Sequence, residues 1–598
     1  MAYIPYTYAP IAEGKRKKVR YTLPTGGVKL CNNDAAVEAG KCANISNMDI
    51  IHDRIRSRRT ATNLSVKSYY NGNFNGLCKQ PFGGKVFFHI GARLYSHDPL
   101  TAESTLISNT LPDKKSLICH FLSKLYIYCD THVYSLDSEF NFKEEDQDIF
   151  APLMYDSIYA SSGESAEKTD APFNLAAPRI TVTFKASATK NFTLPQLLDT
   201  GRKVEIYKDD VLVDAGDYEL REDKIIMNDV TTSSNSRSIK VVYFLLKPEE
   251  AGFYDFVGGC SLATAFGGNA GGGTRLFFTG NNEKKGYYYK SELQNPLHIR
   301  EDEYEIIGDG CENVTALKKM YGDLVIFTDN SVFRMSYNFS SDNTYFSVKE
   351  LSCEVGCDCP DSVQLIDNRV VFMNSKKGVF IMDSTEDTGE QNIKPVSGNI
   401  LRGEGFGLLE NTQQDLISAC SCDYDRKYML FVGNKAYIWD YDVTPFRESA
   451  SYGAAQGRLC WYIYDGVAGG RCVNVDGNLV GFGLSDRVYL YTYAGGAQKS
   501  TRSVLDSGMS ECFYPLVRKH VTGMSIKLKR DEGCEINLSL YGDGEKYYEI
   551  KLPERKNEKE KLLLHLPKKS LYGFGFCINA VGGYEIEEIV AEYIEIKE

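Results

Sequence analysis

The sequence of 598 residues has few of the features that mark a membrane protein or a secreted one. No apolar run approaches the ~18 residues that a membrane-spanning helix needs. The first residues, MAYIPYTYAPIAEGKRKK, place polar and charged side chains where a secretory signal peptide needs an apolar segment. We therefore expect no membrane span, and synthesis in the cytoplasm.

Sequence windows with the period of an amphipathic helix are also scarce, and the neighbourhood of 412–419 is the clearest exception. The chain is instead rich in Tyr (40) and Phe (30), which favour strands, while 52 Gly and 18 Pro supply turns. The length corresponds to about three to four ordinary domains. Together these observations predict a large, almost entirely β protein with several domains.

Patterns that mark common active sites are lacking as well. The glycine-rich stretch 258–280 does not end in the Gly-Lys-Ser/Thr of a phosphate-binding loop, and the eight His are dispersed. A glycosidase needs two facing carboxylates, and carboxylates are too numerous here to be ranked. The candidate carboxylates are Asp329, Asp383, Glu386 and Asp442. We predict that the protein is not an enzyme and binds no cofactor.

The seventeen cysteines are an odd number without the spacing of a disulfide framework. The densest group consists of Cys353, Cys357, Cys359, Cys420 and Cys422. It lacks the paired Cys-x-x-Cys spacing of structural zinc sites, and no His lies near it in the sequence. Packed free thiols in a reducing compartment are the preferred interpretation, rather than a metal site.

What the sequence does contain is a repeated pattern of three short strands separated by tight polar turns. The pattern is clearest from Val314 to Tyr337, where alternating strands flank the continuous apolar run Leu324–Phe327 of a strand buried on both faces. Similar segments occupy 70–98, 116–137, 258–293, 362–384, 418–442 and 471–493. The later repeats start roughly 50 residues apart, within the span of propeller blades. The prediction is a β-propeller of six or seven blades.

Two stretches depart from this repeat. Residues 151–250 are predicted to contain a linker at the small, polar stretch 158–171 and then an inserted small β-domain with a hairpin turn at Asp209-Asp210. An elaborated loop between two blades is an equally good interpretation of the insert. Residues 501–598 contain about seven alternating strands and the turn Gly542-Asp543-Gly544, which predict a C-terminal β-sandwich. The expected domains are an extended N-terminal docking arm (1–62), first propeller blades (63–150), the insert (151–250), the remaining blades (251–500) and the sandwich (501–598).

Charge is distributed unevenly along the chain. The net charge is −12, yet residues 1–59 carry +6 and the remainder −18. A basic leading segment on an acidic body is typical of docking to an acidic partner, although a solvated arm is an equally good interpretation. The candidate assembly contacts are Lys15, Arg16, Lys17, Lys18, Arg54, Arg56, Arg58 and Arg59. The same cations could meet DNA phosphates, but contacts with an acidic face of a neighbouring ring are favoured.

Several short motifs resemble those of tailed-phage virion proteins. They are Gly26-Gly27, the small-residue segment 35–40, Asn47-Met48, the arginine string 54–59, and Gly356-Cys357 ahead of the strand pair 370–383. By these motifs and its repeat pattern, the chain resembles the packaged-DNA stabilisation or tail hub proteins of short-tailed phages. Those proteins are propeller-bearing subunits in a ring beneath the portal.

The resemblance implies a structural virion protein at the head-to-tail connection, located in the viral tail. Its expected work is to close or extend the DNA channel and to stabilise packaged DNA. Its expected partners are a portal or adaptor ring, other tail proteins and further copies of itself in a six-fold or twelve-fold ring, with transient contact to genome DNA. The alternative is a propeller that binds a host-surface glycan or receptor.

Overall fold

Strands dominate the computed structural model of the protein, and the helical segments among its described residues are short. These segments are α1 (Phe256–Gly259), α2 (Gln413–Ile417) and the 3-10 turns η2 (Ala215–Asp217), η4 (Pro360–Ser362) and η6 (Leu408–Glu410). The structure describes residues 16–21, 26–30, 37, 41–51, 54–58, 68–229, 238–268, 273–339, 344–384, 392–403, 405–443, 459–467, 470–484, 488–493, 502–509, 517–552, 559–567 and 569–596. The predicted all-β class is confirmed.

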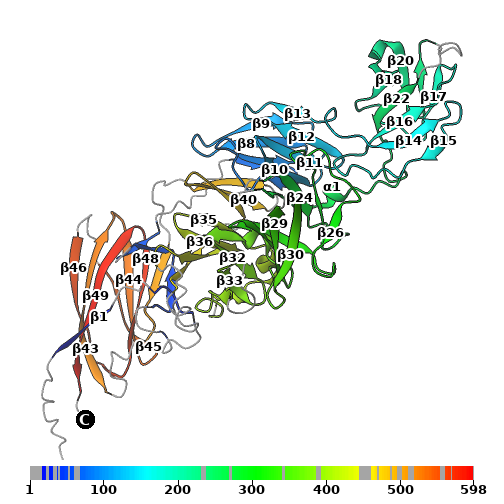
Figure 1. Ribbon diagram of the computed structural model, residues 1–598. Coiled ribbons are helices and arrows are strands. Elements are labelled where there is room, and N and C mark those ends of the chain that lie inside the picture. The colour runs from blue at the N-terminus through cyan, green and yellow to red at the C-terminus, as the bar shows by residue number, and fades with distance from the viewer. Residues whose placement is uncertain are drawn as a thin grey trace, which may run out of the picture.

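Seven antiparallel groups of four strands form the middle of the molecule (Figure 1). The first to third sheets are β6 (Phe74–Leu77), β7 (Val86–Ile90), β8 (Arg93–Asp98), β9 (Glu103–Ser108); β10 (Ser116–Phe121), β11 (Lys124–Cys129), β12 (His132–Leu136), β13 (Phe142–Glu144); and β23 (Leu262–Phe266), β24 (Arg275–Thr279), β25 (Tyr287–Lys290), β26 (Tyr304–Ile306). The fourth and fifth are β27 (Val314–Met320), β28 (Asp323–Thr328), β29 (Val332–Phe339), β30 (Thr344–Ser352); and β31 (Gln364–Ile366), β32 (Arg369–Asn374), β33 (Gly378–Met382), β34 (Ile393–Pro395). The sixth and seventh are β35 (Cys420–Tyr424), β36 (Lys427–Val432), β37 (Lys435–Asp440), β38 (Trp461–Asp465); and β39 (Arg471–Val475), β40 (Asn478–Leu484), β41 (Val488–Tyr493), β5 (Ser68–Tyr70). Each repeated segment supplies three strands of one sheet, and a fourth strand completes it.

The polar turns expected between strands are present, and their backbone explains the residues chosen. Asp367 and Asn368 connect β31 to β32 with φ of 45° and 62°, and Asp425 and Arg426 connect β35 to β36 with φ of 50° and 54°. Two consecutive left-handed residues match the twist of a tight hairpin. Arg426 adopts this conformation even though it is neither Gly, Asn nor Asp.

The seven sheets are arranged as a ring, in a propeller-like manner. The first strands of consecutive sheets contact one another in chain order, from β6 through β10, β23, β27, β31 and β35 to β39. The seventh sheet then packs against the first, with the Phe482 ring centroid 5.5 Å from that of Phe74 and 5.0 Å from that of Phe88. Strand β5 precedes β6 in the chain yet pairs with β41, Tyr69 opposite Tyr489. The seventh sheet is therefore built from both ends of the ring segment, which holds the circle closed.

The insert between the second and third sheets is a small two-sheet domain. Its strands are β14 (Leu153–Ile158), β15 (Ser165–Lys168), β16 (Arg179–Phe184), β17 (Asn191–Thr193), β18 (Glu205–Lys208), β19 (Val211–Leu212), β20 (Tyr218–Arg221), β21 (Lys224–Met227) and β22 (Ile239–Phe244). The order is β15-β14-β16-β22-β18-β19 in one sheet and β17-β21-β20 in the other. The stretch 158–171, expected to be a linker, contributes β15 to this domain.

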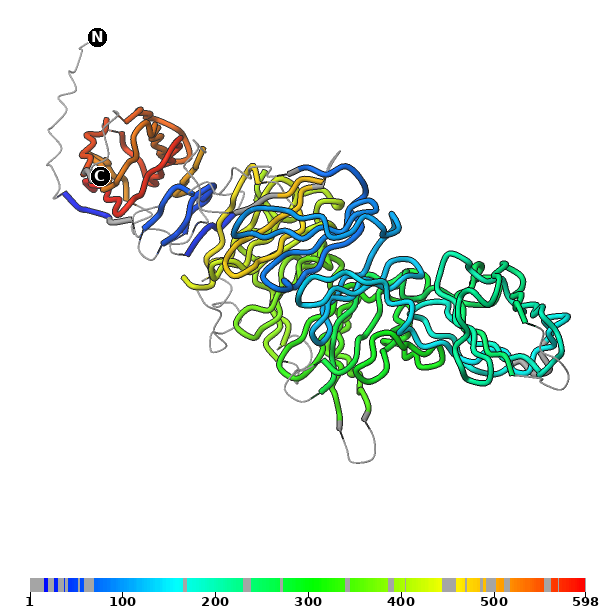
Figure 2. Tube along the Cα trace, turned by 90° about the horizontal axis from the view of Figure 1, so that it is seen from above, coloured from blue at the N-terminus to red at the C-terminus, as the bar shows by residue number. Residues whose placement is uncertain are grey.

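The insert projects from the ring at the end of the molecule opposite the sandwich (Figures 1 and 2), and it is tied firmly to its base. The Leu175 N–H donates to the Ile299 carbonyl at 2.8 Å, and Asn174 Nδ2 donates to the Leu297 carbonyl at 2.8 Å. The Arg202 guanidinium lies 3.5 Å from the Phe244 ring centroid and binds Asp146 at 2.5 Å. Apolar side chains of the insert and of the second and third sheets form one continuous core.

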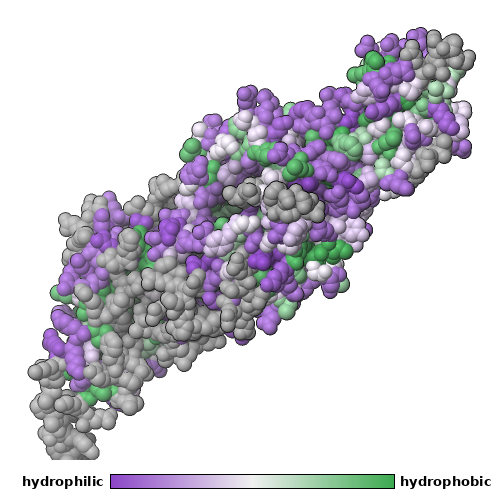
Figure 3. All heavy atoms as spheres, in the orientation of Figure 1, coloured by the Kyte–Doolittle hydropathy of each residue, from purple (hydrophilic) through white to green (hydrophobic). Residues whose placement is uncertain are grey.

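The opposite end is a β-sandwich that contains strands from both ends of the chain. Its strands are β1 (Lys17–Tyr21), β2 (Asn44–Ser46), β3 (Met48–Ile51), β4 (Arg54–Ser57), β42 (Arg502–Asp506), β43 (Lys519–Arg530), β44 (Glu535–Gly542), β45 (Glu545–Lys551), β46 (Lys559–His565), β47 (Ser570–Leu571), β48 (Phe574–Val581) and β49 (Tyr584–Glu595). Alternate residues of β43 and β44 are buried, as expected for two sheets that pack face to face. Hydrophilic residues predominate on the outer face that Figure 3 shows over the ring and the insert.

The N-terminal segment differs from the extended docking arm that the sequence suggested. Strand β1 pairs with β49, and β4 also pairs with β49. Strand β2 lies between β38 of the ring and β42 of the sandwich, so one nine-stranded sheet runs from the sixth ring sheet into the sandwich. One sheet therefore contains strands from both sides of the expected domain boundaries at 62 and 501. The cause is that the partners of these short strands lie hundreds of residues away, where no local pattern indicates them.

Candidate functional site

Charged side chains from sheets that are not neighbours meet across the ring, and those of Lys79 and Arg471 are 60% and 45% exposed. Lys79 follows β6 in the first sheet, and its Nζ lies 2.6 Å from Oδ1 of Asp361 in η4, at the start of the fifth sheet. Arg471, the first residue of the seventh sheet, places Nε 3.3 Å from Oδ2 of the same carboxylate. The first and fifth sheets do not adjoin around the ring, so this contact spans its interior.

Two further cations interact electrostatically with these groups. Lys318 of β27 interacts electrostatically with Lys79 and with Asp423 of β35, which again joins non-neighbouring sheets. Lys115, directly before β10, interacts with Arg471. We call Lys79, Lys115, Lys318, Asp361, Asp423 and Arg471 the axial cluster. It contains four cations and two carboxylates.

The protonation of the cluster follows from its surroundings. Burial disfavours the ammonium group of Lys318, and the positive charge of Lys79 opposes it further, which lowers the pKa of Lys318 to about 8. Burial alone would raise the pKa of Asp361, but the attraction of Lys79 and Arg471 outweighs it, so the pKa is lowered. The pKa of Asp423 is raised by burial, while the Tyr441 hydroxyl donates to its Oδ1 at 2.7 Å.

Asp361 is held in position by contacts to its own backbone segment. The Ser421 hydroxyl donates to the Ser362 carbonyl at 2.7 Å, and the Tyr428 hydroxyl donates to the same carbonyl at 2.9 Å. These bonds reach from the sixth sheet into the fifth and fix η4 where it enters the ring. Sequence reasoning missed the axial cluster. One available signal was Lys318 itself, a cation directly after the alternating residues 314–317 of the clearest repeat.

The basic residues predicted as assembly contacts lie on the sandwich and largely pair with its acidic residues. Lys17 Nζ lies 2.6 Å from Glu595 and Lys18 Nζ 3.0 Å from Glu592 across the β1–β49 pair. Arg54 lies 2.8 Å from Glu585 on the same strand β49. Exposed ion pairs of this kind contribute about 0–1 kcal/mol each, so they orient β1 and β4 more than they stabilise them.

The remaining predicted contacts are divided between surface and core. Arg16 is exposed, whereas Lys15 and Arg59 lie outside the described residues. Arg56 lies 3.9 Å from Asp49. The Arg58 side chain is only 7% exposed, and its guanidinium stacks 4.5 Å from the centroid of the Tyr464 ring. Five of the eight cations thus contact acidic or aromatic side chains of the same chain. Their role in assembly stays a prediction.

Two of the sequence motifs singled out above, Gly26-Gly27 and Asn47-Met48, lie where the ring meets the sandwich. Gly27 has φ of +73°, and a Cβ there would lie 2.4 Å from the Trp461 carbonyl of β38. Next to it, the Val28 N–H donates to that carbonyl at 2.7 Å. The Asn47 amide donates from Nδ2 to the Arg502 carbonyl and accepts from the Asp465 N–H, both at 2.9 Å. Asn47 therefore bonds to the ring and to the sandwich at once.

We call the contacts of Gly27, Val28, Asn47 and strand β2 with β38 and β42 the clasp. A second motif also lies at a close approach, because a Cβ on Gly356 would lie 2.4 Å from the Thr328 carbonyl. Glycine is needed in such places because no other residue lets two backbones come this near. The motifs thus have a structural reason within this chain.

The described cysteines are all free thiols, and most are buried, as the interpretation of packed thiols predicted. Burial raises the pKa of Cys357 to about 12, which leaves its thiol protonated and unreactive. Cys420 and Cys472 both direct Sγ at the Gly470 carbonyl, where the sixth and seventh sheets meet. Within the described ranges, no group of three or more His, Cys, Asp or Glu is arranged to hold a metal ion.

The carboxylates considered for glycoside chemistry are spread over different sheets. Asp383 is held between Arg369 at 2.7 Å and Lys394 at 2.8 Å. Asp442 pairs with Arg426 at 2.8 Å, and Asp329 lies in the turn after β28. Glu386 lies outside the described residues. The ion pairs explain Asp383 and Asp442 as structural groups.

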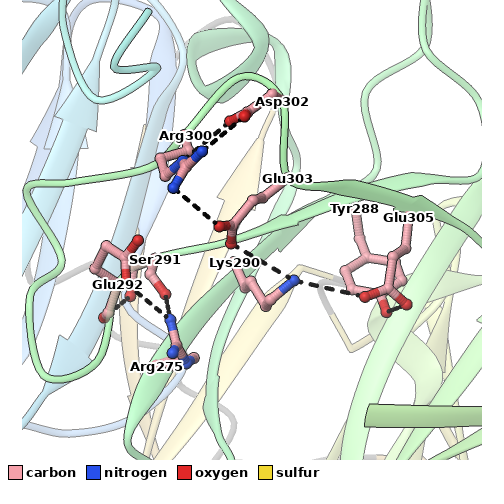
Figure 4. A network of polar contacts seen from close by, with 9 residues as sticks. All are labelled: Arg275, Tyr288, Lys290, Ser291, Glu292, Arg300, Asp302, Glu303 and Glu305. Atoms are coloured by element: carbon pink, nitrogen blue, oxygen red, sulfur yellow. Dashed lines mark hydrogen bonds and ion pairs between the residues drawn. The ribbon is translucent and has the colours of Figure 1, made fainter. Parts of the chain in front are cut away.

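A network of ion pairs covers the outer strands of the third sheet (Figure 4). Its members are Arg275, Tyr288, Lys290, Ser291, Glu292, Arg300, Asp302, Glu303 and Glu305. Arg300 binds Asp302 at 2.7 Å and Glu303 at 3.4 Å, and Lys290 links Glu303 to Glu305 at 3.9 and 3.5 Å. Beside it, the rings of Tyr287 and Tyr304 stack 5.1 Å apart. The network fixes the 300–305 segment against β25.

Comparison with known proteins assigns neither a family nor a function to the chain. The chain matches no protein-family model. It also matches no curated protein sequence. Among solved structures, the AfRom2 CNH domain aligns over 71% of this chain and 98% of its own, at 8% identity and a TM-score of 0.32. Apo AztD from Citrobacter koseri aligns over 71% and 97%, at 12% identity and a TM-score of 0.29. Likenesses this low carry no argument about function.

The helices of the described chain are all too short and polar to cross a lipid bilayer.

Proposed function

We propose that this protein is a structural subunit of a bacteriophage tail, a hub or adaptor at the head-to-tail connection below the portal. It would close or extend the DNA channel and stabilise packaged DNA without catalysing a reaction. In this proposal the seven sheets form a seven-bladed β-propeller. Copies of the subunit would form a six-fold or twelve-fold ring in the virion tail, bound to a portal or adaptor ring and to other tail proteins, with transient contact to genome DNA.

The clasp is the observation that best supports a mechanical role. Strand β2 hydrogen-bonds to both β38 and β42, so a load applied to the sandwich reaches the ring through a continuous sheet. At the other end, the insert shares a core with the second and third sheets. A subunit with two ends locked to a closed middle suits an adaptor that must keep its neighbours in register.

The proposal is tested on particles from the phage or prophage that carries the gene. Quantitative mass spectrometry of purified virions should find this chain at a fixed ratio to the portal protein, at six or twelve copies per particle. Sequencing of the flanking DNA should find portal, terminase or tail genes. Absence of the chain from purified, infectious particles would reject the proposal.

The predicted assembly contacts can be tested without unfolding the sandwich. The double exchange Arg54→Glu with Glu585→Arg keeps the closer of the two intramolecular ion pairs of Arg54, loses its 3.8 Å contact with Glu587, and reverses each charge at the surface. If Arg54 docks on an acidic partner, the exchanged protein should fail to bind isolated tail components while its melting temperature is unchanged. Normal binding would assign Arg54 to the fold alone.

The second candidate, a host glycan or receptor binder, is favoured by exposed apolar groups on the ring and insert. Tyr304 stacks on Tyr287 at the edge of the third sheet and is half exposed. At the hairpin of the insert, Val211 and Leu212 are 69% and 58% exposed. The exposed face of an aromatic ring such as that of Tyr304 can stack on a sugar ring. Glycan-array binding by the full chain that is lost in Tyr304→Ala and retained in Tyr572→Ala would favour this function.

A further inference from the structure

A buried lysine contacts a buried asparagine where the N-terminal segment meets the fifth ring sheet. Lys41 Nζ donates to Oδ1 of Asn399 at 3.1 Å, and the two residues are 358 positions apart in the chain. Lys41 is 8% exposed, and Asn399, in the turn after β34, is 7% exposed. The contact therefore places a primary amine against the side-chain amide of a distant segment, with little access for water.

The backbone on both sides of this contact is fixed by hydrogen bonds. The Leu30 N–H donates to the Asn399 carbonyl at 2.8 Å, and the Lys29 N–H donates to the Cys42 carbonyl at 2.8 Å. Leu30, Cys42 and Ile400 belong to the apolar core that the ring and the sandwich share. The lysine and the asparagine therefore stay together as long as this joint is folded.

The surroundings suit a reaction between the two groups. Burial generally disfavours the charged form of an amine, and only the neutral amine has the lone pair that attacks a carbonyl carbon. Asp440 is 2% exposed, and its N–H donates to the Cys460 carbonyl at 3.0 Å. The Cys460 thiol interacts electrostatically with both Asp440 and Lys41. Burial raises the pKa of Asp440, and a carboxyl group with a raised pKa can accept and return a proton near neutral pH.

We propose that Lys41 and Asn399 are the site of a covalent modification, an isopeptide cross-link within the chain. The bond from Lys41 Nζ to Asn399 Cγ forms, and the bond from Cγ to Nδ2 breaks. Nδ2 leaves as ammonia with one proton taken from Nζ, so the step needs no oxidant and no further reactant. One amide replaces another, and the release of ammonia into solution favours the product.

The cross-link would tie the N-terminal segment to the ring permanently. Strand β2 of the clasp begins shortly after Lys41, so the bond would lie next to the sheet that joins the ring to the sandwich. A cross-link between positions so far apart restricts the unfolded chain strongly, as a disulfide that closes a long loop does. This site goes beyond the proposed function and does not depend on it.

The test uses the full chain, purified and then incubated at neutral pH. Intact-mass spectrometry should find the wild type lighter than its sequence by the mass of one ammonia molecule. After digestion with trypsin, a branched peptide should join the segment of Lys41 to that of Asn399, without cleavage after Lys41. On a denaturing gel the cross-linked chain should migrate ahead of a chain of full mass. A wild type of full mass without the branched peptide would overturn the proposal.

Two variants separate the cross-link from other losses of ammonia. Lys41→Arg removes the nucleophile and Asn399→Ala removes the acceptor amide, so both should keep the full mass. The matched control is Lys519→Arg, because Lys519 is 1% exposed and donates to a backbone carbonyl, that of Tyr572, at 3.0 Å. This control should still lose ammonia. An equal loss of ammonia in Lys41→Arg would indicate succinimide formation at an Asn-Gly pair such as 75–76 and would overturn the cross-link. The measurement on the wild type decides the question even where a variant fails to fold.

Discussion

At the scale of single residues, burial sets the chemistry of several groups that look unremarkable in the sequence. His97 in β8 is 0% exposed, and its Nδ1 lies 2.9 Å from the Ser104 hydroxyl. Burial disfavours the imidazolium and lowers the pKa of His97 to about 4, although Asp98 partly opposes the shift. This residue should therefore couple the stability of the first sheet to pH.

The free energy of unfolding should fall on acidification, because His97 binds a proton in the unfolded chain at pH values at which it stays neutral in the folded chain. The pKa of His97 is near 6.5 in the unfolded chain and about 4 in the folded chain. Its contribution to the free energy of unfolding is therefore fully present above pH 6.5 and is lost as the pH falls toward 4. Between pH 7 and pH 5 this residue should cost about 2 kcal/mol.

Chemical denaturation at the two pH values measures the effect, with His97→Asn as the comparison. The Asn amide can replace Nδ1 as the partner of Ser104 but does not titrate. Other histidines with lowered pKa, such as His89 and His298, act in both proteins and cancel. An equal loss of stability in the two proteins would contradict the assignment.

Gly27 provides a second prediction at this scale, because its strain and its contact can be separated. Gly27→Ala should destabilise the protein by about 2–4 kcal/mol, from a left-handed backbone and from a clash with the Trp461 backbone. The control is Gly84→Ala, where φ is +72° and nothing lies within 4 Å of the added Cβ. That change should cost only about 1 kcal/mol. If the two variants lowered the melting temperature equally, the close approach of Gly27 to Trp461 would not contribute to the destabilisation.

At the scale of elements, strand β5 decides whether the ring is closed. It has three residues, yet it completes the seventh sheet, and Tyr70 packs 4.8 Å from Tyr95 and 5.4 Å from Phe88 in the first sheet. The pairing with β41 is therefore reinforced by side chains that belong to the neighbouring sheet. A short strand can hold a closure only with such support.

Tyr70→Ala should loosen the junction of the seventh and first sheets. Truncating this aromatic side chain removes two ring contacts and costs about 2–3 kcal/mol locally. Hydrogen exchange should show faster exchange in β39–β41 and unchanged rates in the fourth sheet. Tyr69→Ala is the matched control, because Tyr69 is 60% exposed on the same strand. Uniform protection in both variants would show that β5 is dispensable.

At the scale of the whole molecule, the two ends of the chain fold together. The first strands complete both sheets of the sandwich, and β2 joins the sandwich to the ring. An N-terminal arm that served only for docking would be removable without consequence. The shared sheet predicts the opposite.

Deletion of residues 1–58 should therefore unfold or detach the sandwich. Calorimetry should show a separate, lower transition, and limited proteolysis should cut between β42 and β43. The control is deletion of residues 1–16, which ends before β1 and should leave a single transition. Wild-type melting of the longer deletion would restore the docking arm that the sequence suggested.

The strands and turns could be predicted from the amino-acid sequence, because their signals are local. The apolar run Leu324–Phe327, the turn at Asp425-Arg426 and the short helix near 412–419 each depend on neighbours within a few residues, and each is present. The division into repeats, insert and sandwich also follows from local pattern. These features need no knowledge of which strand lies beside which.

How these elements pack against one another could not be predicted from the sequence and became visible in the three-dimensional fold. The hydrogen bond between Asp465 and Asn47 joins residues 418 positions apart, and Lys79 reaches Asp361 across the ring. A pattern in the sequence does not identify such partners, because a basic residue could pair with any of the many acidic residues of the chain. The clasp, the closing strand β5 and the axial cluster all arise in this way, from the order in which the sheets close around a common centre.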